Sequence, residues 1–481
     1  MTVSDLYAIL PVLVVIGWGV LLMIADVFIS PARKNWTALL AAVGLTVGLG
    51  VSLSMAGRSA VAFGGMAVTD GFSTFLDVLF TVVGLAGVGL AYDYLKRMNA
   101  QRGEYYTLLL FSIGGMMLMA HAHDLLLFFL ALELLSIPLY ILSGFLRPRL
   151  QSEEAALKYF LLGAFSSGFL LYGIALTFGA TATTSLPGVV EVVRSGAGNM
   201  PLLLAGIALL VVGFGFKVAA VPFHMWTPDV YQGAPTPIVG FMSTATKAAG
   251  FAALLRLAMV LFPAVAADLT PVLWGLAAVT MLVGNLVALA QTNIKRMLAY
   301  SSIAHAGYLL LGLTAAQAAD VAGQAVAAML FYLAAYGITN IGAWAVVTAA
   351  EQAEGRGLEL EDYAGLGRKY PWLGLSMLVF MLSFTGIPLT LGFWGKYYLF
   401  FVAVEGGFYA LAIVALVASL ISAYYYLRVV VYMFFREGDG TIRRDSWLSL
   451  ITLGSAVAVI ALALIPGQLL QTAVSAFLRL P

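Results

Sequence analysis

The amino-acid sequence predicts an all-α, polytopic membrane protein with about fourteen helices that cross the bilayer. Of its 481 residues, 62% are hydrophobic and only 10% are charged, and the mean hydropathy is +0.99. A soluble fold of this length covers most of its surface with charged side chains, so this composition is typical of a chain that spans lipid. The charged residues gather in short gaps between long apolar runs, which we interpret as loops between spanning helices.

The apolar runs have the length of helices rather than of barrel strands. A helix needs about 20 residues to cross a hydrocarbon core of about 30 Å, whereas barrel strands are alternating segments of about 10 residues. Runs of helical length occur at 6–29, 37–56, 71–94, 105–121, 123–144, 155–181, 201–221, 235–259, 271–290, 298–316, 321–350, 371–400, 407–435 and 447–470. We interpret the first run as a retained helix, because it follows no positively charged segment and carries no cleavage signal.

The distribution of Lys and Arg predicts the orientation of the chain. Most of these residues fall in loops that follow odd-numbered helices, and the positive-inside bias places such loops in the cytoplasm. They are Arg33, Lys34, Lys96, Arg97, Arg102, Arg147, Arg149, Lys295, Arg296, Arg356, Arg368, Lys369, Arg436, Arg443 and Arg444, whereas the other side has little beyond Arg58, Arg194, Arg256 and Arg479. With an even number of helices, we expect both termini on the outer, periplasmic side of a bacterial inner membrane.

Composition also bears on cofactors and partners. The chain has no Cys, which removes thiolate ligation of iron–sulfur clusters, and it has only four His. We therefore expect no cofactor or metal in this chain. A net charge of +1 gives no general attraction to nucleic acid, so we expect none as a partner. The polar cluster of His121, His123 and Asp124 has the residue types of a metal site, but its position between two apolar runs favours a turn.

Charged side chains deep inside the predicted helices are the candidate functional residues, because each costs about 2.5–3.5 kcal/mol at mid-helix. The candidates are Glu133, Lys217, Lys247 and Lys396, with Lys158 and His305 nearer to the ends of their segments. A single such residue is as often a structural ion-pair partner as a functional group. Three deep lysines do not balance one deep glutamate, however. We therefore expect some of these amines to be neutral part of the time and able to pass a proton along.

Two of these lysines lie in helices that Gly and Pro interrupt. The flanking residues are Gly213, Gly215 and Pro222 around Lys217, and Gly386, Pro388, Gly392 and Gly395 around Lys396. A broken helix frees backbone groups that lipid cannot satisfy, so such breaks occur where protein or a hydrated cavity surrounds them. Paired interrupted helices in two halves of a chain indicate an ion pathway.

The paired interruptions also predict an internal repeat. Residues 1–102 would form a three-helix N-terminal segment, 103–262 a first five-helix repeat, 263–436 a second, inverted repeat, and 437–481 a C-terminal helix. An odd number of helices per repeat inverts the second relative to the first. Lys217 and Lys396 would then hold equivalent positions, and so would Glu133 and His305. The alternative, an accidental match among Gly-rich membrane helices, stays open at this point.

Two stretches resemble a known family. GFKVAAVPFHMWTPDVYQGAPTP at 215–237 and NIKRMLAYSSIAHAGYLLLG at 293–312 are similar to the antiporter-like subunits of respiratory complex I, most closely the subunit N type related to mitochondrial subunit 2. The resemblance extends over essentially the whole chain.

The resemblance implies a role for each candidate. Glu133 and Lys217 would be the coupling pair of a first half-channel, with Lys158 among the polar residues near Glu133. Lys247 would be a connecting lysine and His305 part of a central hydrated axis. Lys396 would be the terminal lysine of a second half-channel.

The resemblance further implies a proton-translocating, non-redox subunit of NADH:quinone oxidoreductase. FMN, iron–sulfur clusters and quinone are then expected in partner subunits, and other antiporter-like membrane subunits are expected as neighbours. One alternative is a subunit of a multisubunit cation/proton antiporter, and a nearer one is a hydrogenase- or ferredoxin-linked relative of complex I. A scaffold that binds quinone or lipid without moving ions is disfavoured, because it has no need of unbalanced buried lysines.

Overall fold

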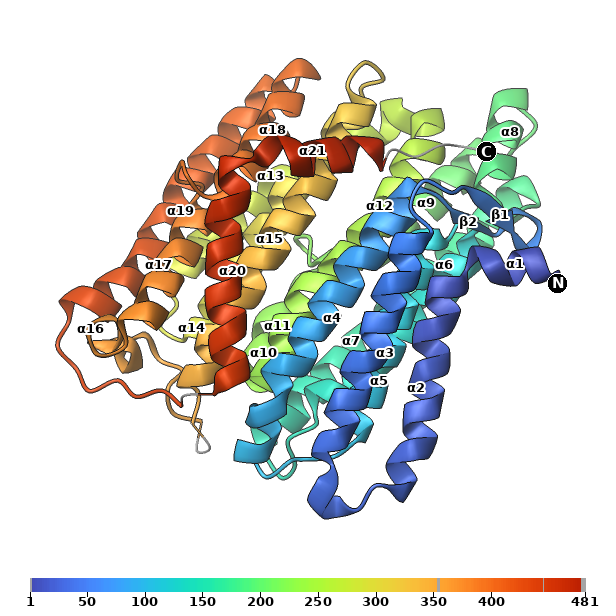
Figure 1. Ribbon diagram of the computed structural model, residues 1–481. Coiled ribbons are helices and arrows are strands. Elements are labelled where there is room, and N and C mark those ends of the chain that lie inside the picture. The colour runs from blue at the N-terminus through green and yellow to red at the C-terminus, as the bar shows by residue number, and fades with distance from the viewer. Residues whose placement is uncertain (1, 353–354, 444, 477–481) are drawn as a thin grey trace.

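Long helices run side by side between two ends of the molecule (Figure 1). The computed structural model describes residues 2–352, 355–443 and 445–476. Two of the predicted loop residues, Arg444 and Arg479, lie outside the described residues. The long helices are α2 (Leu10–Phe28), α3 (Asn35–Ser54), α4 (Gly71–Arg97), α5 (Glu104–His121), α6 (Leu125–Ser143), α7 (Leu150–Thr181), α9 (Met200–Val218), α12 (Lys247–Val260), α13 (Ala266–Leu289), α14 (Ile294–Ala315), α15 (Ala322–Ala350), α17 (Pro371–Thr385), α18 (Leu391–Glu405), α19 (Tyr409–Phe435) and α20 (Ser446–Leu464).

These helices confirm the predicted all-α membrane fold. In the described part of the chain, 12 helical stretches are long and apolar enough to cross a membrane. These 12 stretches do not include α5 or the interrupted pair of α17 and α18. We count α5 as one further crossing and the α17–α18 pair as another. The number of spans is thus the number that the apolar runs predict.

The apolar runs did not predict the shorter elements. These are α1 (Val3–Ala8), α8 (Leu186–Ser195), α10 (Trp226–Gly233), α11 (Thr236–Phe241), α16 (Leu366–Lys369), α21 (Pro466–Ser475), a π-helical turn at Met242–Thr246 that joins α11 to α12, and an antiparallel hairpin of β1 (Ala60–Ala62) and β2 (Ala67–Thr69). The predicted run 447–470 is two helices, because Pro466 cannot extend α20 and begins α21 instead.

The centre of the bundle is formed by helices between residues 236 and 350. The apolar stretch from α11 to α12 is 100% buried and those of α14 and α15 are 94% buried, whereas that of α20 is 22% buried. Side chains on α12, α14 and α15 are therefore shielded by protein on all sides. A polar group on these helices must find its partners within the protein.

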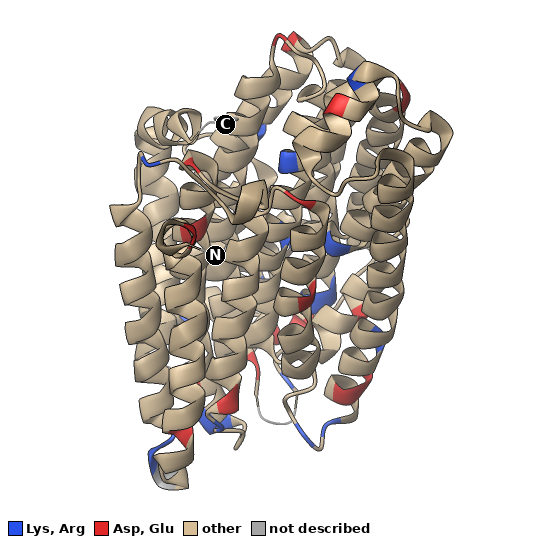
Figure 2. Cartoon of the chain, turned by 90° about the vertical axis from the view of Figure 1, so that its right-hand side faces the viewer, with Lys and Arg blue, Asp and Glu red and all other residues tan. Residues whose placement is uncertain are grey.

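Most Lys and Arg residues in loops lie at one end of the bundle, here termed the basic side. It includes the loops at 29–34, 98–103, 144–149 and 436–443. Figure 2 shows basic residues in loops at this lower end and a second group inside the helices.

Two basic residues lie inside the bundle: Lys295, which the sequence assigned to a loop, and Arg256, which falls within the predicted run 235–259. α14 begins one turn earlier than predicted, so Lys295 is in its first turn and 1% exposed. Its ammonium donates to the carbonyl oxygen of Ala234 at 2.7 Å. Arg256 lies within α12 and is also 1% exposed.

Arg256 is fully paired at the end of the bundle opposite the basic side. Its Nη1 and Nη2 donate to Asp70 Oδ2 and Oδ1 at 2.5 and 2.9 Å. Its Nε and Nη2 also donate to the carbonyl oxygen of Ala120 at 3.2 and 3.0 Å. Asp70 additionally accepts from the N–H of Ser73 and caps α4. This ion pair therefore joins α4, α5 and α12.

We expect Asp70→Asn to destabilise the protein by about 3–5 kcal/mol, because it leaves a buried guanidinium without its counter-charge. The measurement is the unfolding temperature of the purified protein in detergent. Arg194→Gln, at an exposed position, is the control and should leave that temperature unchanged. An unchanged unfolding temperature of the Asp70→Asn variant would mean that the Ala120 carbonyl alone compensates the charge of Arg256.

Candidate functional site

Lys217 lies in the last turn of α9, directly before the first break in a spanning helix. Residues 219–225 separate α9 from α10, and Ala219 has a positive φ of 62°. The freed backbone groups are satisfied by protein. The indole N–H of Trp226 donates to the Phe216 carbonyl at 3.0 Å, and the Val221 N–H donates to Thr280 Oγ1 at 3.0 Å. The predicted interruption is therefore present and is enclosed by neighbouring helices.

The Lys217 ammonium has only neutral hydrogen-bond partners. It is 4% exposed, and it donates to Ser136 Oγ at 2.8 Å and to Tyr159 Oη at 3.3 Å. Glu133, one turn before Ser136 on α6, accepts a hydrogen bond from Ser167 of α7 instead. Glu133 and Lys217 thus lie in one neighbourhood without a direct ion pair.

Lys158, which the resemblance placed among the polar residues near Glu133, forms ion pairs with two other carboxylates. Its ammonium is 2.7 Å from Asp229 Oδ2 and 2.7 Å from Glu154 Oε1, and its side chain is 41% exposed. Consecutive residues point about 100° apart around a helix. Because Tyr159 faces Lys217, its neighbour Lys158 must face away, toward α10.

Asp229 connects this exposed lysine to the buried part of the molecule. It accepts from Lys158 on α7 at 2.7 Å and from Arg296 on α14 at 2.8 Å. Burial alone would raise the pKa of Asp229, but the hydrogen bonds from the two cations lower that pKa overall. The carboxylate therefore stays ionised and ties α10 to two spanning helices on the basic side.

A second carboxylate on the basic side, Glu351 at the end of α15, is fully buried and fully paired. It accepts from Tyr94 Oη and from Arg149 Nη1, each at 3.1 Å, and from the Thr236 hydroxyl. Burial alone would raise the pKa of Glu351, whereas nearby Lys295, Thr236 and Arg149 lower it overall. The sequence did not single out Glu351, because this residue lies at the end of a predicted span. A charged residue at such a position does not indicate a buried site.

Lys247 begins α12, directly after the π-helical turn, and has no carboxylate partner among the described residues. It is 3% exposed. Its ammonium donates to the carbonyl oxygens of Ser302, on α14, and of Val218, on α9, the latter at 3.4 Å. Because Val218 directly follows Lys217, Lys247 contacts the end of the helix that carries the preceding lysine. Gly250 allows this approach, since an added Cβ there would lie 2.7 Å from Val218 Cγ1.

α14 carries polar groups that face the centre of the bundle. Ser302, His305 and Tyr308 are spaced three residues apart, so they share one face of the helix. His305 is 3% exposed, and its Nδ1 and Nε2 lie 2.5 Å from Tyr332 Oη and 3.0 Å from Tyr426 Oη. Both ring nitrogens are thus in hydrogen-bond contact with hydroxyl groups, and the imidazole forms no ion pair with a carboxylate of the described residues.

Lys396 lies in α18, after the second break, which separates it from α17. Its ammonium donates to the Thr385 carbonyl at 3.0 Å and to Ser419 Oγ at 2.8 Å, and it lies 4.7 Å from the centre of the Tyr308 ring. Gly386 has a φ of 88°, and a Cβ at this position would lie 3.0 Å from Lys396 Cδ. Both the backbone conformation and the space therefore require glycine here.

The candidates form a series across the bundle. Lys247 contacts the helix of Lys217 on one side and α14 on the other. His305 lies on α14 one turn beyond Ser302, and Tyr308, a further turn along, lies over the Lys396 ammonium. Sequence reasoning did not name the hydroxyl groups that join the series, namely Ser136, Tyr159, Ser167, Tyr332, Ser419 and Tyr426. Only Ser136 carried a signal, its spacing of three residues from Glu133.

The cluster at residues 121–124 is a turn, as its position favoured. Asp124 caps α6 by accepting from the Leu126 N–H at 2.8 Å, and His121 Nε2 lies 2.9 Å from Asp77 Oδ2. This contact joins α4, which carries Asp77, to α5. In the described part of the chain, no three His, Asp or Glu side chains are grouped so that they could hold a metal ion.

Comparisons with known proteins place this geometry in a family. Residues 122–422 match the family described as NADH:quinone oxidoreductase/Mrp antiporter, TM. The chain is 46% identical over 469 residues to NADH-quinone oxidoreductase subunit N of Trichlorobacter lovleyi. The aligned region covers 96% of this chain and 94% of that protein.

Solved structures agree over the whole length. A chain of respiratory complex I from Thermus thermophilus with bound aureothin is 40% identical, with a TM-score of 0.83, over 96% of this chain and 98% of that one. A chain of the Mrp complex from Dietzia sp. has a TM-score of 0.84 at 21% identity, over 99% of this chain and 97% of that one. The second likeness shows a shared fold alone, whereas the first and the curated relative share sequence across nearly the full chain. The chain therefore belongs to the subunit N family of NADH-quinone oxidoreductase, as an antiporter-like membrane subunit of a multisubunit complex.

Proposed function

We propose that this chain moves protons across the membrane through Glu133, Lys217, Lys247 and Lys396, with His305 and Lys158 in supporting positions. The driving reaction is electron transfer from NADH to quinone in partner subunits, which hold FMN, iron–sulfur clusters and the quinone. The chain itself acts as a non-redox proton translocase in this scheme. Its membrane is the bacterial inner membrane, with the basic side in the cytoplasm and both termini outside.

One observation carries the proposal: three buried lysine ammonium groups lie in series with only neutral partners. Lys217, Lys247 and Lys396 are each 3–4% exposed, and their hydrogen-bond acceptors are hydroxyl and carbonyl oxygens. A buried charge that serves structure alone is normally matched by an opposite charge. A lysine without one exchanges its proton more readily, because burial disfavours the charged amine.

Glu133 supplies the variable charge at the start of the series. It accepts a hydrogen bond from Ser167 and lies one helical turn from Ser136, an acceptor of Lys217. An ionised Glu133 favours the protonated form of Lys217, and neutralising or moving it favours release of the proton toward Lys247. His305 and its two tyrosine hydroxyls then offer the proton a route from α14 toward Lys396, through groups that both donate and accept protons.

The two broken helices support the inverted repeat that the sequence predicts. We propose that 103–262 and 263–436 are equivalent five-helix units, with Lys217 and Lys396 each beside the break of one unit. Lys217 precedes its break and Lys396 follows its own, so the two amines approach the bundle centre from different segments. Each unit would then open a half-channel to one side of the membrane.

The rival is cation/proton exchange without a redox partner. Purification of the tagged chain in mild detergent separates the two. We expect flavin, iron–sulfur absorbance and NADH:quinone activity to copurify with the chain. Copurification of small membrane subunits alone, together with cation-dependent proton exchange in vesicles, would replace the redox-driven function with the antiporter function.

We expect Lys217→Ala to lower proton pumping and the coupled NADH:quinone activity together, by about tenfold or more, because it removes the first amine of the series. The measurement is acidification of membrane vesicles alongside NADH oxidation, in preparations matched for assembled complex. Lys96→Ala, an exposed lysine on the basic side, is the control and should leave both rates unchanged. Full pumping in an assembled Lys217→Ala complex would contradict the proposal.

We expect Gly386→Ala to impair pumping to a similar degree, because the new methyl group meets the Lys396 side chain and the positive φ disfavours alanine. Gly454→Ala, in α20, is the matched control, since an added Cβ there has no neighbour within 4 Å among the described residues. The readout is the ratio of protons moved to NADH oxidised. An unchanged ratio in Gly386→Ala would show that the position of Lys396 is not critical.

A further inference from the structure

A cleft between α17 and α20 opens on the basic side of the bundle. It has a volume of about 280 Å³ and is here termed the α17–α20 cleft. Its wall includes Lys369 and Arg443 together with the apolar side chains of Trp372, Leu448 and Leu453. The cleft is therefore lined by cationic groups and by hydrocarbon.

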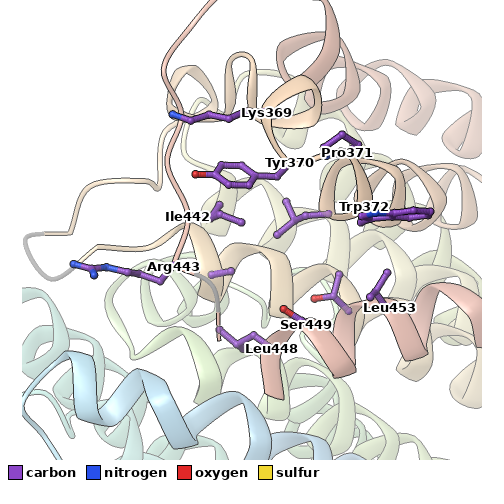
Figure 3. Close-up of a pocket in the computed structure, with 12 residues that line it drawn as sticks. Lys369, Tyr370, Pro371, Trp372, Ile442, Arg443, Leu448, Ser449 and Leu453 are labelled. Atoms are coloured by element: carbon purple, nitrogen blue, oxygen red, sulfur yellow. The ribbon is translucent and has the colours of Figure 1, made fainter. Parts of the chain in front are cut away.

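The charged and apolar groups of the cleft point to different sides. In Figure 3 the Lys369 ammonium and the Arg443 guanidinium extend to one side, whereas Trp372 and Leu453 lie on the other. Both cationic side chains are exposed, and in the described part of the chain neither forms a salt bridge. A ligand that spans the cleft would meet positive charge at one end and apolar surface at the other.

A second cavity adjoins the cleft on its charged side. Its volume is about 530 Å³, and it shares Tyr370, Ile442 and Arg443 with the cleft. Arg97 and Arg356 also line it. The two cavities together thus form a polar compartment next to an apolar one.

Arg97 lines this polar compartment, and two of its buried hydrogen-bond donors have no acceptor among the described residues. Its side chain is 11% exposed, and its Nη2 donates to the Thr348 carbonyl at 2.6 Å. Its Nε and Nη1 have no hydrogen-bond acceptor among the described residues, and Asp445 Oδ2, at 3.5 Å from Nη1, is the one acidic oxygen in ion-pair range. Buried guanidinium donors without acceptors favour an anionic oxygen ligand.

Two helices begin at this point, which adds to the positive potential. α17 starts at Pro371 and α20 at Ser446, and Asp445 makes no side-chain cap on α20. The N–H groups of a first helical turn have no partner within the helix and attract anions. The two helix N-termini and the nearby cations therefore both favour an anion at this position.

The apolar side of the cleft is exposed at the surface of the bundle. Trp372 is 74% exposed, Trp447 is 49% exposed and Leu453 is 42% exposed. Exposed tryptophans at the ends of spanning helices mark the level of the lipid headgroups, and basic pockets between such helices bind anionic headgroups.

We propose that an anionic phospholipid binds in the α17–α20 cleft. Its phosphate lies among Arg97, Lys369 and Arg443, and one acyl chain packs against Trp372, Leu448 and Leu453. The inference requires only that the chain spans a membrane and is independent of the proton pathway. α17 runs from this cleft to Thr385, the residue whose carbonyl accepts from Lys396.

The test places a photoreactive benzophenone side chain at position 453 of the chain within its complex. The complex is reconstituted in nanodiscs with equal amounts of phosphatidylglycerol and phosphatidylcholine, and adducts are identified by mass spectrometry. We expect phosphatidylglycerol adducts to exceed phosphatidylcholine adducts by about tenfold. The same side chain at Leu416, an exposed position of α19, should show no headgroup preference.

A charge-matched pair of variants tests the headgroup contact. Lys369→Gln with Arg443→Gln should abolish the preference at position 453, whereas Arg33→Gln with Arg102→Gln, two exposed basic residues that line neither cavity, should preserve it. Equal adducts of the two lipids in the unmodified cleft, or a polypeptide adduct from a neighbouring subunit, would overturn the proposal.

Discussion

The structure depends on one constraint: a backbone polar group inside a membrane must find its partner within the protein. Both breaks in the spanning helices meet this constraint with side chains from other segments. At the first break, Trp226 donates to the Phe216 carbonyl and Thr280 accepts from the Val221 N–H. At the second, the Lys396 ammonium itself donates to the freed Thr385 carbonyl. This lysine therefore helps to satisfy the break beside which it is buried, so its position and the irregular backbone are maintained together.

The buried charges divide into two chemical kinds. Arg256 and Arg149 are each matched by a carboxylate, Asp70 or Glu351, and these pairs join helices near the two ends of the bundle. Arginine keeps its proton under all ordinary conditions, so such pairs fix structure. The lysines at the centre form hydrogen bonds only to neutral oxygens. Burial makes a lysine release its proton more readily, because it disfavours the charged amine. The cost of burying a charge is thus compensated in the arginine–carboxylate pairs, which hold helices together. It is not compensated at the central lysines, whose protons can therefore exchange.

α14 is the element that makes the series continuous. It is almost entirely buried, and its inward face supplies the Ser302 carbonyl to Lys247, the His305 ring to two tyrosines, and the Tyr308 ring to Lys396. Two of the helices that carry the lysines, α12 and α18, contact it directly. α17 extends this arrangement outward, because one of its ends accepts from Lys396 and the other forms a wall of the α17–α20 cleft.

The sequence by itself determined the membrane fold, the number of spans, the two broken helices and the buried titratable residues. It could do so because apolar runs, Gly and Pro interruptions and isolated charges are local features whose cost in lipid is large. The tertiary structure alone decided the partners: that Lys158 faces Asp229, that Arg256 is matched by Asp70, and that Ser136, Tyr159 and Ser419 bond the lysines. These contacts join residues far apart in the chain, and hydroxyl side chains are common in membrane helices. Only the packing of helices against one another selects which of them meet a charge.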